Sequence, residues 1–153
     1  MKAVSARLAA ATLVGLAGLG PVPGTAAAQT PADSAAIRAT ALDYIEGFYT
    51  GDAERMERAL HDDLKKRIVQ RKPGEPEVLD EMTKTQLVEM TAGGGGTGMP
   101  DDLKVSDVTI LDIYGEMASV KIVAGAWVDY MHIARVNGDW VIVNVLWEML
   151  PRG

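Results

Sequence analysis

Residues 127–149 read WVDYMHIARVNGDWVIVNVLWEM, and this stretch decides the fold. Both halves are rich in Val, Ile, Trp and Tyr, which is typical of β-strands. Asn137-Gly138 stands between the two halves and is a hairpin signal, because both residues tolerate the positive φ that a type I′ turn needs. The stretch therefore predicts two antiparallel strands joined by a tight turn.

The strand pattern extends back along the chain from this hairpin. Apolar and β-branched residues predict strands over Leu103 to Tyr114, Met117 to Val136 and Asp139 to Met149. Gly115 supplies the first turn, and Gly125 is expected to bend the long middle strand. The C-terminal half is therefore predicted to form an antiparallel meander.

The N-terminal half instead has the spacing of helices. Thr30-Pro31-Ala32-Asp33 is a helix start, and Gly51-Asp52 predicts the end of that helix and the cap of a second. A capping-box pattern at Thr83 to Gln86 begins a third helix. Helical spacing predicts a buried stripe on the first helix, made of Ile37, Ala41, Tyr44, Ile45 and Phe48. It predicts a second buried stripe on the next helix, made of Met56, Ala59 and Leu60.

Two further segments connect these helices to the meander. Leu64 to Lys72 is basic with a few apolar members and is predicted to be a short edge strand, whose charges discourage edge pairing. Gly93 to Gly96 is predicted to be a flexible loop, a hinge or lid. Helices first and a meander last predict the α+β class, with helices covering one face of a curved antiparallel sheet and a pocket between them.

The hairpin register predicts which side chains face that pocket. A two-residue loop pairs Arg135 with Trp140 and, continuing without a break, Asp129 with Leu146. The predicted ligand-binding residues are Tyr44, Phe48, Trp127, Asp129, Met131, Asn144 and Leu146. The opposite, Val-rich face is expected to form a homodimer contact through Tyr130, His132, Val143, Val145 and Trp147. A register slip of one residue would exchange the two faces.

The first 28 residues have the plan of a cleavable signal peptide. Lys2 and Arg7 precede an apolar run from Leu8 to Leu19, and small residues precede a cleavage site after Ala28. The run is shorter than the roughly 20 residues that span a bilayer. We therefore expect a secreted or periplasmic protein with one domain, residues 29–153, that is not held in a membrane after cleavage.

Composition excludes several classes of function. The chain has no cysteine, which excludes thiol nucleophiles, disulfides and cysteine zinc sites. Loss of Lys2 and Arg7 with the leader changes the formal charge from −6 to −8, so nucleic acid is not expected as a partner. We expect no metal site at His61-Asp62-Asp63, because the side chains of adjacent residues at a helix end seldom converge on one ion.

Two segments carry a resemblance to a known superfamily. Residues 44–52, YIEGFYTGD, and residues 137–144, NGDWVIVN, resemble the nuclear transport factor 2-like superfamily. The helical hairpin and residues 143–148 are most similar to the Putative lumazine-binding family. The resemblance implies a cone-shaped, cystatin-like sheet filled by helices, often dimeric, in proteins that include isomerases, dehydratases and noncatalytic binders, so fold alone does not decide function.

Ketosteroid isomerase gives a sharper comparison within that superfamily. Tyr44 resembles one of its pocket tyrosines, and Asp129-Tyr130-Met131 resembles the strand that carries its oxyanion-hole aspartate. The matching position for its catalytic base falls at or near Ile68, where no carboxylate stands. The resemblance therefore implies no ketosteroid isomerase reaction, and we identify no catalytic residue and no cofactor.

These observations predict an exported domain that binds a small apolar molecule in the cone pocket. Two alternatives stay open: a cofactor-free lyase or isomerase that uses Asp129 with Tyr44, and a protein-interaction domain. The first needs a second acid or base beside Asp129, and the second needs no cavity.

Overall fold

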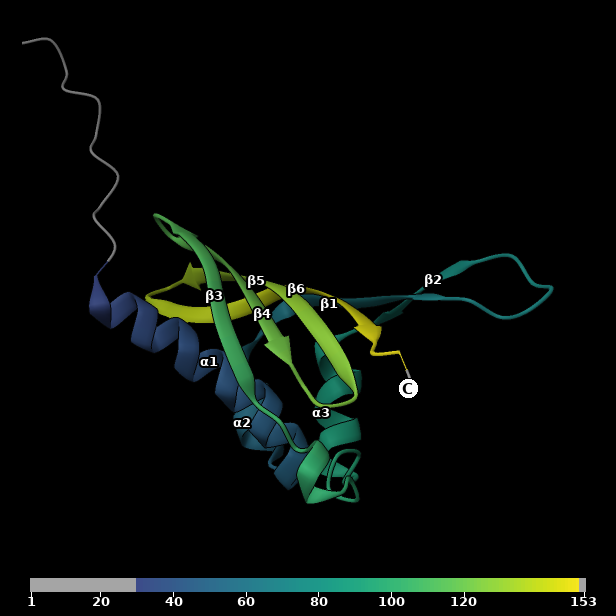
Figure 1. The fold of residues 1–153 in the computed structure, drawn as a ribbon. Helices are drawn as coiled ribbons and strands as arrows, with labels where there is room; N and C mark the ends of the chain where they lie inside the picture. The colour runs from purple at the N-terminus through teal and green to yellow at the C-terminus, as the bar shows by residue number, and fades with distance from the viewer. Residues whose placement is uncertain (1–29, 152–153) are drawn as a thin grey trace, which may run out of the picture.

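A computed structural model describes residues 30–151, so the predicted signal peptide lies outside the described residues. The helices are α1 (Pro31–Thr50), α2 (Ala53–Ala59), α3 (Lys84–Ala92) and a short 3-10 turn, η1 (Asp101–Leu103). The strands are β1 (Leu60–Gln70), β2 (Val78–Met82), β3 (Asp107–Tyr114), β4 (Met117–Val123), β5 (Trp127–Val136) and β6 (Asp139–Met149). They form one curved sheet in the order β2-β1-β6-β5-β4-β3, with the helices packed against one face (Figure 1). The predicted α+β class is confirmed.

The helix boundaries follow the capping residues in the sequence. Thr30 and Asp33 form a capping box that begins α1, and Gly51 ends it with φ 73°. Asp52 accepts from the backbone N–H of Arg55 and so caps α2, and Thr83 forms a second capping box at α3. All three predicted helices are therefore confirmed.

The first two helices form a tight hairpin. A Cβ on Gly47 of α1 would lie 3.0 Å from the Arg55 Cβ, so a larger residue would push α2 away. Arg55 and Arg58 on α2 both pair with Asp43 on α1, at 2.9 and 2.6 Å. Backbone proximity and charge therefore fix the hairpin together.

The long middle strand predicted over Met117 to Val136 is instead two strands, β4 and β5. Gly125 lies in the turn between them with φ +68°, and a Cβ there would lie 2.3 Å from the Leu103 carbonyl oxygen. Gly125 therefore reverses the chain rather than bending a continuous strand.

The basic segment after α2 is not an edge strand. β1 lies between β2 and β6, antiparallel to β2 and parallel to β6, and β2 forms this edge of the sheet, opposite the β3 edge. Lys65 and Arg67 both pair with Glu81 on β2, at 2.7 and 2.8 Å, so opposite charges fix a hairpin that the sequence did not predict. The far end of this hairpin projects from the rest of the molecule (Figure 1).

A β-bulge in β6 changes the predicted register of the central hairpin. Arg135 pairs with Trp140 and Ile133 with Ile142, as predicted, but His132 then pairs with Asn144, so Val143 is the extra residue. Beyond the bulge Asp129 pairs with Trp147, not with Leu146. Every side chain of β6 from residue 144 onward therefore lies on the face opposite to the predicted one.

The glycine-rich loop after α3 packs closely against α1. A Cβ on Gly96 would lie 2.4 Å from the Phe48 carbonyl oxygen, and one on Gly95 would lie 3.2 Å from the Phe48 ring. Gly96 is buried. These glycines permit close backbone approach, which the prediction of a flexible hinge did not include.

Candidate functional site

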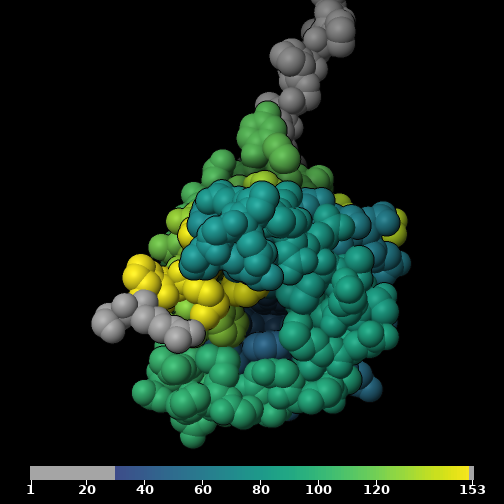
Figure 2. Space-filling model, turned by 90° about the vertical axis from the view of Figure 1, so that its right-hand side faces the viewer, coloured from purple at the N-terminus to yellow at the C-terminus, as the bar shows by residue number. Residues whose placement is uncertain are grey.

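A cavity of about 440 Å³ lies between the helices and the concave face of the sheet. Figure 2 shows its opening as a hollow, with residues coloured as α1 and α2 at the bottom and the C-terminal end of β6 on one side. The lining comes from α1, α2, α3, the glycine-rich loop and the segment after it, η1, the turn before β5, and four strands: Tyr44, Ile45, Phe48, Met56, Lys66, Met82, Leu87, Met90, Gly95, Met99, Leu103, Ala126, Trp127, Trp147 and Met149. Apart from Lys66 and the polar ends of Tyr44, Trp127 and Trp147, this lining is apolar.

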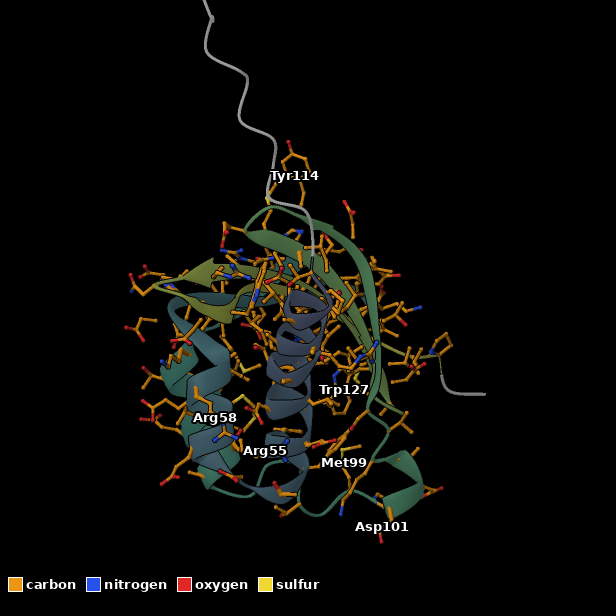
Figure 3. The ribbon with its side chains drawn as sticks, turned by 90° about the vertical axis from the view of Figure 1, so that its left-hand side faces the viewer. Arg55, Arg58, Met99, Asp101, Tyr114 and Trp127 are labelled. Carbon is orange, nitrogen blue, oxygen red and sulfur yellow. The ribbon has the colours of Figure 1, made fainter. Side chains whose placement is uncertain are left out.

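Methionine dominates the cavity wall. Five of the eight methionines of the chain line it, from α2, α3, β2, the loop before η1 and β6. Figure 3 shows Met99 near Trp127, both beside α1. Methionine is unbranched and polarizable, so such a wall adapts to ligands of different shapes.

A buried polar cluster lies at the inner end of this apolar cavity. Lys66 Nζ donates to Asp129 Oδ1 and to the Tyr44 hydroxyl, both at 2.6 Å. Tyr44 donates to Asp129 Oδ2 at 3.3 Å, and Trp127 Nε1 donates to the same oxygen at 2.8 Å. Four side chains from α1, β1 and β5 therefore satisfy one another inside the protein.

Burial controls the ionisation of this cluster. Burial lowers the pKa of Lys66, and the neighbouring Asp129 carboxylate partly offsets that effect. Burial and, next, the charge of Asp129 hold the pKa of Tyr44 well above its ordinary value, so its hydroxyl keeps its proton. The same two causes raise the pKa of Tyr49 to about 12.

Aromatic rings also contact the lysine. Nζ lies 4.7 Å from the centre of the Trp147 ring and 5.4 Å from that of Tyr44. Such contacts stabilise an ammonium group that has lost most of its water. Within residues 30–151, the buried Trp147 Nε1 has no hydrogen-bond partner. The indole N–H of this cavity-lining residue is therefore a donor without an acceptor among the described residues.

Three of the predicted pocket residues, Tyr44, Phe48 and Trp127, line the cavity. Asp129 is fully buried and reaches the cavity only through Tyr44, Lys66 and Trp127, which bond to it. Met131 is 1% exposed and packs in the core. Asp129 therefore lies on the same sheet face as the cavity-lining Trp127, and its part in ligand binding stays a prediction.

The predicted positions of four residues on β6 are wrong. Asn144 and Leu146 lie on the outer face of the sheet, where Leu146 is 52% exposed. Val145, predicted on the outer face, is fully buried, and Trp147 lines the cavity. The bulge at Val143 causes all four errors, because one extra residue reverses the alternation beyond it.

The other residues predicted for the dimer contact lie on or near the outer face. Tyr130 is 53% exposed, His132 is exposed, and Val143 is half-buried at the bulge. Contact with a second copy stays a prediction.

Lys66 is the main residue that sequence reasoning missed. It is 5% exposed, although its neighbours Lys65 and Arg67 face outward to Glu81. Two signals in the sequence could have identified Lys66 as buried. It stands two residues after the apolar Leu64, so both side chains lie on the same face of the strand, and a buried aspartate requires a countercharge. The prediction treated Lys65 to Arg67 as one exposed basic group instead.

Other kinds of site find little support in the part of the chain that the structure describes. No three His, Asp or Glu side chains of residues 30–151 converge as metal ligands would. Asp62 pairs with Lys84 at 2.8 Å, on the surface. No described helix combines the length and apolar character needed to cross a membrane.

Comparison with solved structures identifies the fold. An NTF2-like protein of unknown function from Silicibacter pomeroyi superposes with a TM-score of 0.61 at 19% identity, over 80% of this chain and 100% of that chain. One from Methylobacillus flagellatus gives 0.62 at 20% identity, over 84% and 100%. A ketosteroid isomerase-like protein from Erwinia carotovora atroseptica gives 0.54 at 17% identity, over 80% and 100%. These similarities show the fold alone.

The sequence comparison is more specific. No protein of curated function matches the chain significantly. The model of the family described as Putative lumazine-binding matches residues 32–148. This range contains all the helices, apart from the first residue of α1, and nearly all of the sheet. The fold is thus that of NTF2-like proteins, and the chain belongs to the Putative lumazine-binding family.

Proposed function

We propose that this protein binds a small, neutral, largely apolar molecule whose polar end meets Lys66. The observation that carries the proposal is an apolar cavity of about 440 Å³ that ends at the Lys66–Asp129 pair. A volume of this size suits a compact organic ligand. The family description points in the same direction, since it names a small molecule.

The charge balance of the cluster favours a neutral ligand. The ammonium of Lys66 and the carboxylate of Asp129 already cancel at 2.6 Å. An anionic ligand would leave one unbalanced charge in an apolar cavity, which is costly. An ammonium has three donors, and two point to Tyr44 and Asp129 among the described residues, so Nζ can donate one more hydrogen bond to a carbonyl or hydroxyl oxygen.

Tryptophan fluorescence tests this proposal. Octan-1-ol is expected to change the emission of the protein, because Trp127 and Trp147 line the cavity. Octanoate, which has the same chain length and a full charge, is expected to bind about tenfold more weakly or worse, given the cost of an unpaired buried charge. Equal binding of octan-1-ol and octanoate would contradict the proposal, and so would a failure of both to bind.

A matched pair of variants localises the signal. Trp147→Phe removes a ring from the cavity wall, whereas Trp140→Phe removes one that stacks on Arg135, 4.8 Å away, outside the lining. The response to octan-1-ol should fall in the first variant and persist in the second. The reverse pattern would move the binding site away from the cavity.

We also propose self-association through the outer sheet face. Tyr130 and Leu146, 53% and 52% exposed, pair across β5 and β6 and border a second hollow with Val128 and Ile68. Tyr130→Glu should then lower the mass measured by sedimentation, while Tyr114→Glu, on a side chain 65% exposed at the end of β3, should not. A monomeric starting protein would refute this.

Export of the protein is a further proposal, supported by the leader pattern of residues 1–28. N-terminal sequencing of protein recovered from the culture medium or periplasm should begin at Gln29. Recovery of the intact N-terminus from the cytoplasm would contradict it.

A further inference from the structure

We propose that Lys66 is a nucleophilic amine that captures neutral aliphatic aldehydes or ketones in the cavity as an imine. The inference rests on the proposed function, since the cavity must first bind the carbonyl compound. The covalent step takes place at one atom, Lys66 Nζ. Its substrates are neutral, largely apolar compounds with a carbonyl group.

The position of Nζ suits this chemistry. Lys66 lines the cavity, yet its side chain is only 6% exposed, so it meets the ligand rather than bulk water. The centre of the Trp147 ring lies 4.7 Å from Nζ, and Met56, Met82 and Met149 line the same cavity. An amine in such surroundings is uncharged more readily than one on the surface, since burial lowers the pKa of Lys66.

Neighbouring groups can carry the protons of the reaction. Asp129 Oδ1, 2.6 Å from Nζ, can take a proton from the ammonium and give it back. The Tyr44 hydroxyl, also 2.6 Å from Nζ, keeps its proton and can donate to the carbonyl oxygen by turning that proton away from Asp129 Oδ2, which lies 3.3 Å off. Asp129 alone would supply no such donor, but here Asp129 and Tyr44 both lie beside Nζ.

The step balances in atoms and charge. Proton transfer from the ammonium to Asp129 frees the nitrogen lone pair, which attacks the carbonyl carbon and forms the C–N bond. The carbonyl oxygen receives that proton, and the resulting carbinolamine loses water with a second proton from nitrogen. Lys–NH3+ and the carbonyl compound thus give a protonated imine and one water, with no oxidant or reductant.

The charge of the product fits the buried site. A protonated imine carries one positive charge, as the ammonium did, so Asp129 remains paired throughout. Removing one partner of a buried pair would leave an uncompensated charge, and this reaction avoids that cost. Capture of an anion by the same lysine would have no such compensation.

Reductive trapping with octanal tests the inference. The purified protein is incubated with octanal and cyanoborohydride at neutral pH, and peptide mapping locates the secondary amine that reduction leaves. Because the cavity holds the aldehyde beside Nζ, Lys66 should be labelled about tenfold faster than Lys72, whose side chain is 67% exposed. Lys66→Arg keeps the cation but removes the primary amine, and should abolish the fast label; Lys72→Arg should leave it intact.

A competition in the unmodified protein needs no variant. Octan-1-ol has no carbonyl group and should protect Lys66 from octanal without protecting Lys72. Labelling that follows exposure, with Lys72 ahead of Lys66, would overturn the imine, as would fast labelling of Lys66 that octan-1-ol does not reduce. If octan-1-ol binds in the fluorescence assay and Lys66 stays unlabelled, only the imine fails; if octan-1-ol does not bind, the proposed function fails with it.

Discussion

Lys66 Nζ lies 2.6 Å from Asp129 Oδ1, although their strands, β1 and β5, are not neighbours in the sheet. β6 runs between them, and Lys66, which pairs with Val145 of β6, has its Nζ over the Trp147 ring. The pair therefore joins the parallel part of the sheet to its antiparallel part, and it does so at the end of the cavity. We therefore expect stability and the proposed ligand binding to depend on the same two side chains.

Removing one partner of this pair should be costly. Asp129→Leu leaves the Lys66 ammonium buried without a countercharge, and we expect it to lower the free energy of unfolding by about 3–5 kcal/mol. The double variant Lys66→Met with Asp129→Leu should recover most of that loss. Asp63→Leu, at a side chain 95% exposed, is the control in urea unfolding. A double variant no more stable than the single one would show that charge is not the cause.

Buried tyrosines predict a loss of stability in alkali. Burial raises the pKa of Tyr49 from 10.0 to about 12, so between these pH values the unfolded chain releases a proton that the folded protein retains. The folded state then binds more protons, and the free energy of unfolding falls as pH rises. Tyr49→Phe should flatten its own share of this slope, whereas Tyr114→Phe, at a residue 65% exposed, should not change it.

Close packing of the glycine-rich loop can be tested with alanine. Gly96→Ala would place a Cβ 2.4 Å from the Phe48 carbonyl oxygen, and we expect a loss of about 1–3 kcal/mol in unfolding free energy. A Cβ on Gly98 would meet nothing within 4 Å, so Gly98→Ala should be neutral or slightly stabilising. Equal effects would mean that the loop is as mobile as its composition suggests.

The shifted register of β6 makes neighbouring residues unequal. Val145 is fully buried and Leu146 is 52% exposed. Val145→Ala should cost about 2 kcal/mol of unfolding free energy, and Leu146→Ala well below about 1 kcal/mol. The opposite ranking would restore the unbroken register that the hairpin turn alone predicts.

Cavity volume should govern affinity. Met99→Phe introduces a larger, stiffer side chain into the lining and is expected to weaken octan-1-ol binding several-fold. Met117→Phe, at a residue 58% exposed on β4 and outside the lining, should have no effect. Calorimetric titration of both variants gives the comparison.

Local signals in the sequence predicted the elements well where one residue type controls the backbone. Thr30, Asp52 and Thr83 begin helices, and Asn137 adopts φ 53° in the hairpin turn as its position beside Gly138 indicates. These effects act over three or four residues, so they are visible without tertiary structure. The family resemblance, carried by the same segments, is confirmed by the family match.

Long-range features could not be derived in the same way. No residue type near Val143 marks a bulge, and it becomes visible only in the pairing of β6 with β5 and β1, where both ladders shift register. Burial of Lys66 depends on Asp129, which is 63 positions away. A cavity does lie between the helices and the sheet, but the β6 side chains beyond the bulge, Trp147 among them, were assigned to the wrong face.

Because Val143 is the extra residue of the bulge, the number of residues in β6 decides which of its later side chains face the cavity. Deleting that one residue from the gene would present Asn144, Leu146 and Glu148 to the cavity and turn Val145 and Trp147 outward, with no other change in sequence. Point substitutions can alter the cavity gradually, one side chain at a time. A change of length here would instead replace the whole β6 wall at once, so we expect selection against insertions and deletions to be strictest at this position.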